Sequence, residues 1–405
     1  MNKTILVYTI LFFTTATAWA QNDFGIDFHG FVKTDVFYDT RQTVDIREGH
    51  FLLYPKNELL DNNGEDINAN PEFNILSIQS RLTGKIKAPD FLGAKSSGVI
   101  EGAFFGHSEG DVNGFRLRHA FVKLDWENTS LLVGQTWNPL FITDMFPNVV
   151  SFNTGVPFQP FSRNPQVRVW QRFSDFHVSL AAHTQRDFTS LGPDGGSFKY
   201  IRNAAMPTLA MNLDYVTENF HIGVAGEYKT IKPMIYKGVP TIEVIEETLS
   251  STAFEGYMRF NTGDLKVSLL GLMGENMSDL VMLGGYGLKK NIDVDVIEYA
   301  PIKTMSGLID ITYGKEFVVG LFGGYTKNMG SDEELNADMV WTRGKDIESV
   351  IRVSPRAWYQ TGKTRFACEI EYTAAAYGTP NSKFEVENSE MVNNIRILFG
   401  AYLFF

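Results

Sequence analysis

The sequence predicts an all-β protein, a transmembrane antiparallel β-barrel of about 16 strands. Three observations predict this fold class. Apolar and polar residues alternate along many segments of about ten residues. Short turn-like links alternate with long polar links, and the chain ends on the apolar run NNIRILFGAYLFF (393–405). Alternation with a period of two places successive side chains on opposite faces of a strand, so the two faces meet different media.

The first 20 residues, MNKTILVYTILFFTTATAWA, have the pattern of a secretory signal peptide. A basic start is followed by an apolar stretch over 5–13 and by Ala18 and Ala20 of an A-x-A cleavage site. The alternative is a membrane-anchoring helix, but the apolar run is shorter than the about 20 residues that a span needs. We therefore expect export from the cytoplasm and a single barrel domain over 21–405.

Composition limits the classes of function. The formal net charge of −11 argues against nucleic acid as a partner. The single cysteine, Cys368, cannot form an internal disulfide. We predict no cofactor and no metal site. The acidic loop segments 57–72 and 330–338 are either solvated or bind divalent cations that bridge lipopolysaccharide.

Alternation of apolar and polar residues defines the strands. In SIQSRLTGKIK (77–87), Ile78, Leu82 and Ile86 share one parity, whereas Arg81 and Lys85 share the other. The sixteen predicted strands are 26–39, 75–88, 97–106, 115–126, 130–137, 166–173, 176–184, 206–216, 220–231, 251–261, 265–274, 304–313, 317–327, 349–360, 364–377 and 393–405.

The links between these strands predict the topology. Alternate links are short, such as ENTS (127–130), SD (174–175) and TEN (217–219), and the others are mostly long and polar. Short periplasmic turns and long extracellular loops are typical of bacterial outer-membrane barrels. A soluble β-sandwich would also alternate. The signal peptide, the even strand count and the apolar last strand argue against a sandwich.

The last strand has one wholly apolar face, formed by Ile395, Ile397, Phe399, Ala401, Leu403 and Phe405. We expect this face to meet lipid, and the strand to pair with the first strand over 25–40. Closure removes both sheet edges, whose unpaired backbone groups would cost several kcal/mol each in hydrocarbon. The terminal phenylalanine also resembles the signal that the barrel-assembly machinery reads. That resemblance implies an assembly role for Phe399, Ala401, Leu403 and Phe405.

One strand breaks the alternation. In FRLRHAFVKLDW (115–126), Arg116 and Arg118 share their parity with apolar residues that follow. Either a β-bulge near His119 restores the phase, or part of this strand faces a neighbouring subunit.

The segment 138–165 follows the fifth strand and is therefore the third long loop. It is rich in proline and phenylalanine and carries few charges. We expect it to fold into the barrel and narrow the aqueous channel that about sixteen strands would leave. The alternatives are a loop packed over the barrel top or one buried in a subunit interface.

Arginines with inward parity are the candidate pore-lining residues. Rings of arginine line pores that pass anions, because a guanidinium group stays charged and lowers the entry barrier for carboxylate or phosphate. Asp144, in the inward loop, would set up a transverse field across them. The alternative is that these are solvated wall residues. The candidates are Arg81, Arg116, Arg118, Arg168, Arg172, Arg352 and Arg356 on strands, with Arg163 near the end of the loop.

Three segments, GFVKTDVFYDTR (30–41), GQTWNPL (134–140) and SRNPQVRVW (162–170), resemble the DcaP-type porins, which are sixteen-stranded trimeric outer-membrane channels. The resemblance implies diffusion of small acids, including dicarboxylates, through an arginine-lined constriction. By position, the resemblance assigns the role of constriction residue first to Arg163 and Arg168. It assigns the same role second to Arg81, Arg116 and Arg118. No coiled-coil segment precedes the first strand, which puts a trimer-stabilising stalk in doubt. The glycine- and phenylalanine-rich composition suits a Bacteroidota-type outer membrane.

The predicted function is therefore a porin of the bacterial outer membrane, a passive channel for small hydrophilic solutes and ions, above all anionic ones, and not an enzyme. Its expected partners are outer-membrane lipid and lipopolysaccharide, the barrel-assembly machinery, two further copies in a homotrimer, and small anionic solutes. One alternative is a receptor or adhesin acting through the long loops. Another is a barrel hydrolase, although the seven histidines form no H-E-x-x-H motif and no G-x-S-x-G motif occurs. The chain is too short for a plugged receptor of 22 strands.

Overall fold

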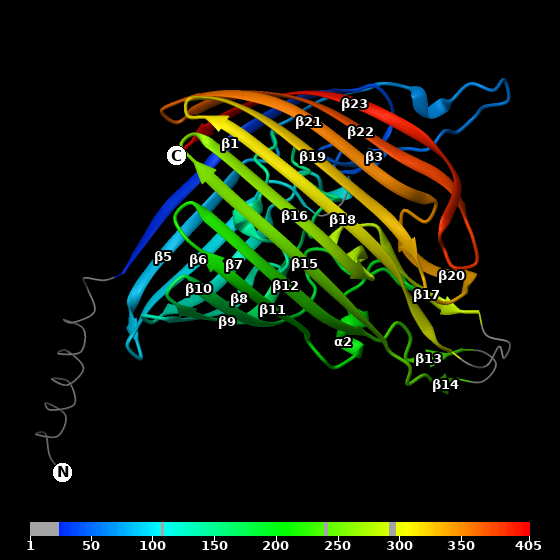
Figure 1. Ribbon diagram of the computed structural model, residues 1–405, viewed down its shortest axis with the longest axis horizontal. Coiled ribbons are helices and arrows are strands. Elements are labelled where there is room, and N and C mark those ends of the chain that lie inside the picture. Colours follow the sequence, from blue (N-terminus) through cyan, green and yellow to red (C-terminus); the bar gives the residue numbers. More distant parts are fainter. Residues whose placement is uncertain (1–23, 107–108, 239–241, 291–296) are drawn as a thin grey trace, which may run out of the picture.

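The computed structural model describes residues 24–106, 109–238, 242–290 and 297–405. The signal peptide expected over 1–20 lies outside the described residues. Figure 1 shows long strands lying side by side around one axis. None of the helices in the described ranges is long and apolar enough to span a membrane.

Sixteen strand positions form the barrel wall, and neighbouring strands pair antiparallel. The second position is divided between β4 and β5, which both pair with β1. In wall order the strands are β1 (Gly25–Asp39), β4 (Glu72–Leu76) with β5 (Arg81–Phe91), β6 (Ala94–Ala103), β7 (Arg116–Asp125), β8 (Thr129–Trp137), β9 (Arg163–Phe173), β10 (Phe176–His183), β11 (Thr208–Val216), β12 (Phe220–Ile231), β15 (Leu249–Thr262), β16 (Leu265–Glu275), β18 (Tyr299–Gly314), β19 (Phe317–Gly330), β21 (Ile347–Thr361), β22 (Thr364–Pro380) and β23 (Val386–Phe404).

The barrel closes between its first and last strands, as the sequence predicts. β1 and β23 pair from Phe31 opposite Phe404 to Asp39 opposite Arg396. The terminal Phe405 continues this pairing, because its N–H donates to the Gly30 carbonyl at 3.1 Å. Closure leaves the wall without a free edge, which satisfies the backbone groups that hydrocarbon could not.

The two rims differ in the way predicted. Short turns join the strands at one rim, and long loops join them at the other. The long loops contain elements that the sequence analysis missed. They are β2 (Thr43–Ile46), β3 (Phe51–Pro55), β13 (Tyr236–Lys237), β14 (Glu243–Val244), β17 (Gly284–Lys289), β20 (Leu335–Arg343), the helix α2 (Lys199–Asn203), and the 3-10 turns η1 (Ile67–Ala69), η2 (Glu109–Asp111), η3 (Thr143–Met145) and η4 (Ser278–Leu280). Most of them are too short to show alternation, and the nine-residue β20 begins within the segment 330–338, predicted as an acidic loop.

Several predicted strand boundaries were wrong. β18 begins at Tyr299 rather than at 304, and β23 begins at Val386 rather than at 393. The strand expected over 75–88 is interrupted at 77–80, where the Ser80 hydroxyl accepts a hydrogen bond from the Lys33 N–H at 3.1 Å. β9 begins at Arg163 rather than at 166, so Arg163 belongs to the wall. The first residues of β9 are nearly all buried, on both faces of the strand. The sequence there therefore lacks the alternation of apolar and polar residues that marks a strand.

The faces agree with the parity assignment. On β23, Ile397, Phe399 and Leu403 lie exposed on the outer face, whereas Arg396 and Leu398 are buried on the inner one. The irregular strand β7 contains the β-bulge that was one of two open interpretations. Glu101 pairs with His119 but Gly102 pairs with Leu117, so Arg118 is the extra residue.

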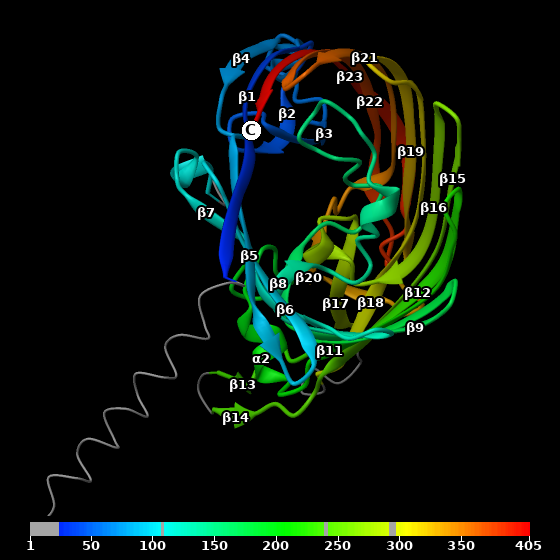
Figure 2. The ribbon, with the colours of Figure 1, turned by 90° about the vertical axis from the view of Figure 1, so that its left-hand side faces the viewer.

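A hydrophobic core lies inside the barrel, toward the long-loop rim. It packs Phe51 of β3 against Phe152 and Phe161 of the third long loop, and against Leu280 of η4. Figure 2, which looks along the barrel from the end that carries the C-terminus, shows these segments within the ring of strands. Inward-folded loops therefore fill part of the lumen toward the long-loop rim. The rest of the lumen contains cavities.

Candidate functional site

The third long loop, 138–162, folds into the barrel as predicted. Its two ends meet where the Asn138 N–H donates to the Ser162 carbonyl at 3.0 Å. Trp137 stacks on Phe141 with ring centroids 4.0 Å apart, and Phe161 meets the same tryptophan edge-on. The apolar side chains are buried against the wall and the other inward segments, which explains why an exposed loop position carries so many aromatic residues.

The later part of this loop is held to the wall through its backbone. Lys33 Nζ donates to the Val150 carbonyl at 2.7 Å, and Arg352 Nη1 donates to the Val156 carbonyl at 2.6 Å. The Ser306 hydroxyl donates to the Phe158 carbonyl at 2.9 Å. An irregular segment inside a barrel needs such partners for its backbone groups.

Arg352 and Arg356, predicted as pore-lining residues, are both buried. Arg352 binds the loop, and Arg356 Nη2 lies 2.6 Å from Asp310 Oδ1. Neither borders the two lumen cavities described below.

Four of the predicted arginines come together on the wall between β5 and β9. Arg116 Nη2 lies 3.1 Å from Asp187 Oδ1, and Arg163 Nε donates to Asp187 Oδ2 at 2.8 Å. Asp187 lies on the segment that follows β10. Both guanidinium groups and this carboxylate are almost fully buried.

The other two arginines share a second carboxylate. Arg118 Nε donates to Glu101 Oε1 at 2.7 Å, and Arg81 Nε lies 3.5 Å from the same oxygen. Arg118 and Arg163 both lie over the Trp137 ring, at 5.8 and 4.6 Å from its centroid. We call the four residues Arg81, Arg116, Arg118 and Arg163 the arginine chain.

Sequence reasoning missed a neighbour of this chain, Arg47. Its Nη1 and that of Arg116 both donate to the Gly106 carbonyl, at 3.3 and 3.2 Å. Both guanidinium groups lie over the Phe105 ring. Arg47 is in a loop, where no alternation of faces could have indicated it.

A first cavity of about 350 Å³ opens beside the arginine chain. Arg81, Arg118 and Arg365 supply its cationic side chains. Aromatic rings line much of the rest, among them Trp137 and Phe141. The guanidinium groups of Arg81 and Arg118 place positive charge at the wall of this cavity, where it would attract a small anion.

A second cavity, of about 480 Å³, lies beside the start of the inward loop. It contains Arg168, Lys123 and Trp170, and it shares Trp137, Phe141 and Thr143 with the first cavity. Phe141 and Thr143 of the loop therefore border both cavities.

Arg168 does not join the arginine chain. Its Nη2 donates to the Ser179 hydroxyl at 2.9 Å and to Asn212 Oδ1 at 3.1 Å. Arg172 donates through Nη2 to the Ser130 hydroxyl at 3.0 Å. Among the residues that the structure describes, neither arginine forms an ion pair with a carboxylate. No carboxylate of the described ranges is in direct contact with either guanidinium group, although Asp214 acts on Arg168 and Asp125 acts on Arg172 through their charges at longer range.

Asp144, predicted as the loop's acidic residue, binds the wall of the second cavity. Its Oδ2 lies 3.0 Å from His221 Nδ1 and 2.9 Å from Arg259 Nη1. The hydrogen bond from His221 holds the pKa of the Asp144 carboxyl below its ordinary value. The second ring nitrogen of His221, Nε2, lies 2.9 Å from Asp214 Oδ1.

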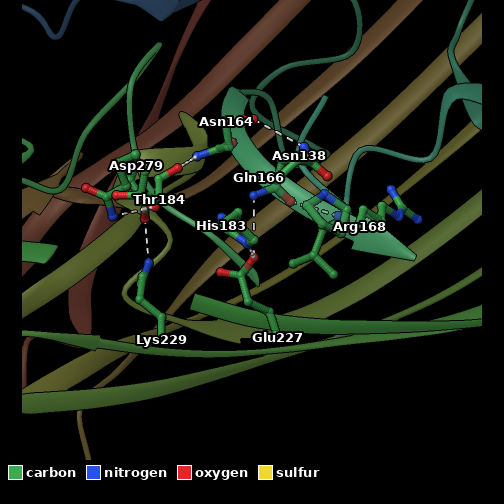
Figure 3. A network of polar contacts seen from close by, with 12 residues as sticks. Asn138, Asn164, Gln166, Arg168, His183, Thr184, Glu227, Lys229 and Asp279 are labelled. Carbon is green, nitrogen blue, oxygen red and sulfur yellow. Dashed lines mark hydrogen bonds and ion pairs between the residues drawn. The ribbon is translucent and has the colours of Figure 1, made fainter. Parts of the chain in front are cut away.

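A polar network ties the ends of the inward loop to β10 and β12 (Figure 3). His183 Nε2 lies 3.1 Å from Glu227 Oε2, which also accepts a hydrogen bond from Asn138 Nδ2 at 3.4 Å. Nearby, Lys229 pairs with Asp279 of η4. Sequence reasoning did not identify these partners. The inward parity of Glu227 and Lys229 is the signal that could have indicated them.

Comparison with known proteins gives matches among solved structures alone, because no family model and no curated protein matches the chain. The outer membrane channel DcaP of Acinetobacter baumannii aligns with a TM-score of 0.71 at 15% identity, covering 95% of this chain and 99% of that chain. The chain has the DcaP-type, sixteen-stranded porin fold.

Other structures share this DcaP-type fold less closely. The trimer form of OmpT from Vibrio cholerae has a TM-score of 0.55 at 12% identity, covering 95% of this chain and 100% of that chain. OmpF of Salmonella typhi, in complex with daunomycin, has a TM-score of 0.54 at 11% identity, covering 94% and 97%. At these identities the likeness concerns the fold.

Proposed function

We propose that the protein is an outer-membrane porin, a passive diffusion channel that favours small anionic solutes of the carboxylate type. The observation that carries this proposal is that guanidinium groups border both lumen cavities, and that the one in the second cavity has no carboxylate of the described residues in direct contact. Arg81 and Arg118 border the first cavity, and Arg168 borders the second. The DcaP-type fold supports the channel function, since the DcaP structure is described as an outer membrane channel.

The charge balance favours anions over cations at Arg168. The side chains that contact its guanidinium group, Ser179 and Asn212, are neutral. A fixed guanidinium group attracts a carboxylate and also presents paired donors that match its geometry. At the arginine chain, Asp187 and Glu101 already neutralise part of the charge. We therefore assign the stronger anion attraction to Arg168.

The expected location and partners belong to the same proposal. The fold's neighbours are outer-membrane proteins, one of them a trimer form, which supports the outer membrane and a homotrimer. The apolar outer face of β23 suits contact with lipid and lipopolysaccharide. Phe399, Ala401, Leu403 and Phe405 would present the assembly signal. The Bacteroidota type of membrane stays a prediction.

A barrel hydrolase is the second candidate because one contact favours it. His119 Nδ1 lies 3.0 Å from the Thr136 hydroxyl, and Nε2 lies 3.8 Å from Glu101 Oε1. The second distance exceeds a hydrogen bond, and Glu101 is engaged by Arg118. A nucleophile needs a base that a third group orients, so we favour the passive channel. Ester hydrolysis that Thr136→Ala abolishes would reverse this choice.

The test is the reversal potential in a planar bilayer under a KCl gradient, on the purified protein and on Arg168→Ala. We expect anion selectivity that falls in the variant. Lys315→Ala is the matched control, because it removes one positive charge from an exposed turn outside the lumen. Cation selectivity that Arg168→Ala leaves unchanged would contradict the proposal. Absence of conductance would favour a receptor or an enzyme.

A further inference from the structure

The early part of the inward loop is held differently from the later part. Backbone hydrogen bonds fasten the later part to the wall, at Val150, Val156 and Phe158. In the early part, Asn212 Nδ2 donates to the Pro139 carbonyl at 2.9 Å. Apart from that bond, the polar contacts of 139–146 with the described part of the wall are those of Asp144 with His221 and Arg259. Apolar packing and these ionic contacts together position 139–146, and the ionic part depends on the charge of its partners.

The ring of His221 lies between two carboxylates. Nδ1 is 3.0 Å from Asp144 Oδ2 of the loop, and Nε2 is 2.9 Å from Asp214 Oδ1 of β11. An ionised carboxylate only accepts hydrogen bonds, so both ring nitrogens must carry a proton to make both contacts. The geometry is that of an imidazolium ion bridging two carboxylates.

The surrounding charged groups leave His221 as the group whose charge changes. From β15, Arg259 binds Asp144, and the Tyr257 hydroxyl donates to Asp214 Oδ1 at 2.6 Å. Arg168 of β9 and His177 of β10 border the same cavity, and Lys266 of β16 acts on Asp144 through its charge. Arginine and lysine stay protonated through neutral pH, whereas histidine titrates there.

We propose that His221 is a positioning residue whose protonated ring holds the early part of the inward loop against the wall and so sets the width of the passage. The inference rests on the proposed channel function. Loss of a ring proton leaves one carboxylate facing a nitrogen lone pair, and the two like charges of Asp144 and Asp214 lose the cation between them. Of its contacts with the described part of the wall, the segment 139–146 then keeps the ion pair of Asp144 with Arg259, the Pro139 hydrogen bond and its apolar packing, so the loop withdraws more readily and the passage beside 141–143, next to both cavities, widens.

The test is single-channel conductance in symmetric KCl from about pH 5 to about pH 10, a range that spans the titration of a histidine in a charged setting. We expect the wild-type conductance to rise in one step toward alkaline pH. His221→Gln should lose that step, because glutamine does not titrate. His221→Arg carries a permanent cation, and it should keep the low-pH conductance across the whole range.

His177→Gln is the matched control, because His177 borders the same cavity but hydrogen-bonds to no residue of the described ranges. It should keep the alkaline step. The inference is overturned if the wild type shows no step, or if His221→Gln keeps it while His177→Gln loses it. A protein that conducts without a step would still leave the proposed porin function intact. A protein that does not conduct would overturn both.

Discussion

The two groups of lumen arginines differ in how their charge is compensated. Toward the long-loop rim, Arg116 and Arg163 are buried and share the Asp187 carboxylate. Toward the short-turn rim, Arg168 and Arg172 bind neutral oxygens, and Arg168 borders the second cavity. All four have inward parity in the sequence. The comparison teaches that an arginine's strand face is less informative about solute binding than the presence or absence of a carboxylate partner.

The largest effect we expect is on stability at the buried end. Asp187→Asn would leave Arg116 and Arg163 buried without their carboxylate, and breaking such a pair costs about 3 to 5 kcal/mol. The free energy of unfolding, measured by urea titration in lipid vesicles, should fall accordingly. Asp194→Asn is the control, because this carboxylate is 60% exposed and should leave stability nearly unchanged. If both variants had the same free energy of unfolding, the Asp187 carboxylate would not stabilise the buried arginines, and the two arginine groups would not differ in this respect.

The next effect concerns solute affinity at the open end. Removing a unit charge about 4 Å from a bound carboxylate in a wet lumen loses about 1 kcal/mol, or roughly fivefold in affinity. We expect Arg168→Gln to raise the half-blocking concentration of succinate by that factor in single-channel recordings. Arg356→Gln, on the opposite wall and paired with Asp310, should have little effect on block in the molecules that fold. If the half-blocking concentration of succinate rose equally in both variants, pairing of an arginine with a carboxylate would not affect its binding of the solute.

Salt concentration should distinguish the two ends in a third way. Raising the ionic strength from about 0.1 to about 1 M shortens the Debye length from about 10 to about 3 Å. Anion selectivity that depends on Arg168 should therefore weaken strongly in this range. Stability that depends on the buried Asp187 pairs should change little, because buried pairs are screened less. Selectivity that is independent of salt would place the filter among the buried residues.

The smallest effect should come from Arg172→Gln. Arg172 lies at the end of β9 next to the short turn, whereas Arg168 lies deeper and stacks over Trp170. Screening by salt is stronger near the mouth, so we expect less than about a twofold change in succinate block. An effect larger than that of Arg168→Gln would move the anion site toward the rim.

Much of the fold could be predicted because a membrane barrel repeats one physical constraint at every strand. The outer face must be apolar and the inner face is free to be polar, so alternation marks strands, and parity assigns Arg168 or Ile397 to a face. The bulge at Arg118 was predicted as one of two explanations, because a phase slip is visible in sequence. The split of β4 from β5 was missed, because 77–80 keep the alternation without pairing as a strand.

By itself, the sequence determined the barrel, its closure through the last strand, the rims and the faces, because these follow from local pattern and from the contrast between lipid and water. Only the tertiary structure decided which charges meet. His221 and Asp144 are 77 residues apart, and Asp187 reaches the arginine chain from a loop without periodicity. Those encounters depend on how irregular segments fold inside a closed wall, and no local pattern encodes the side of the wall that a loop will reach.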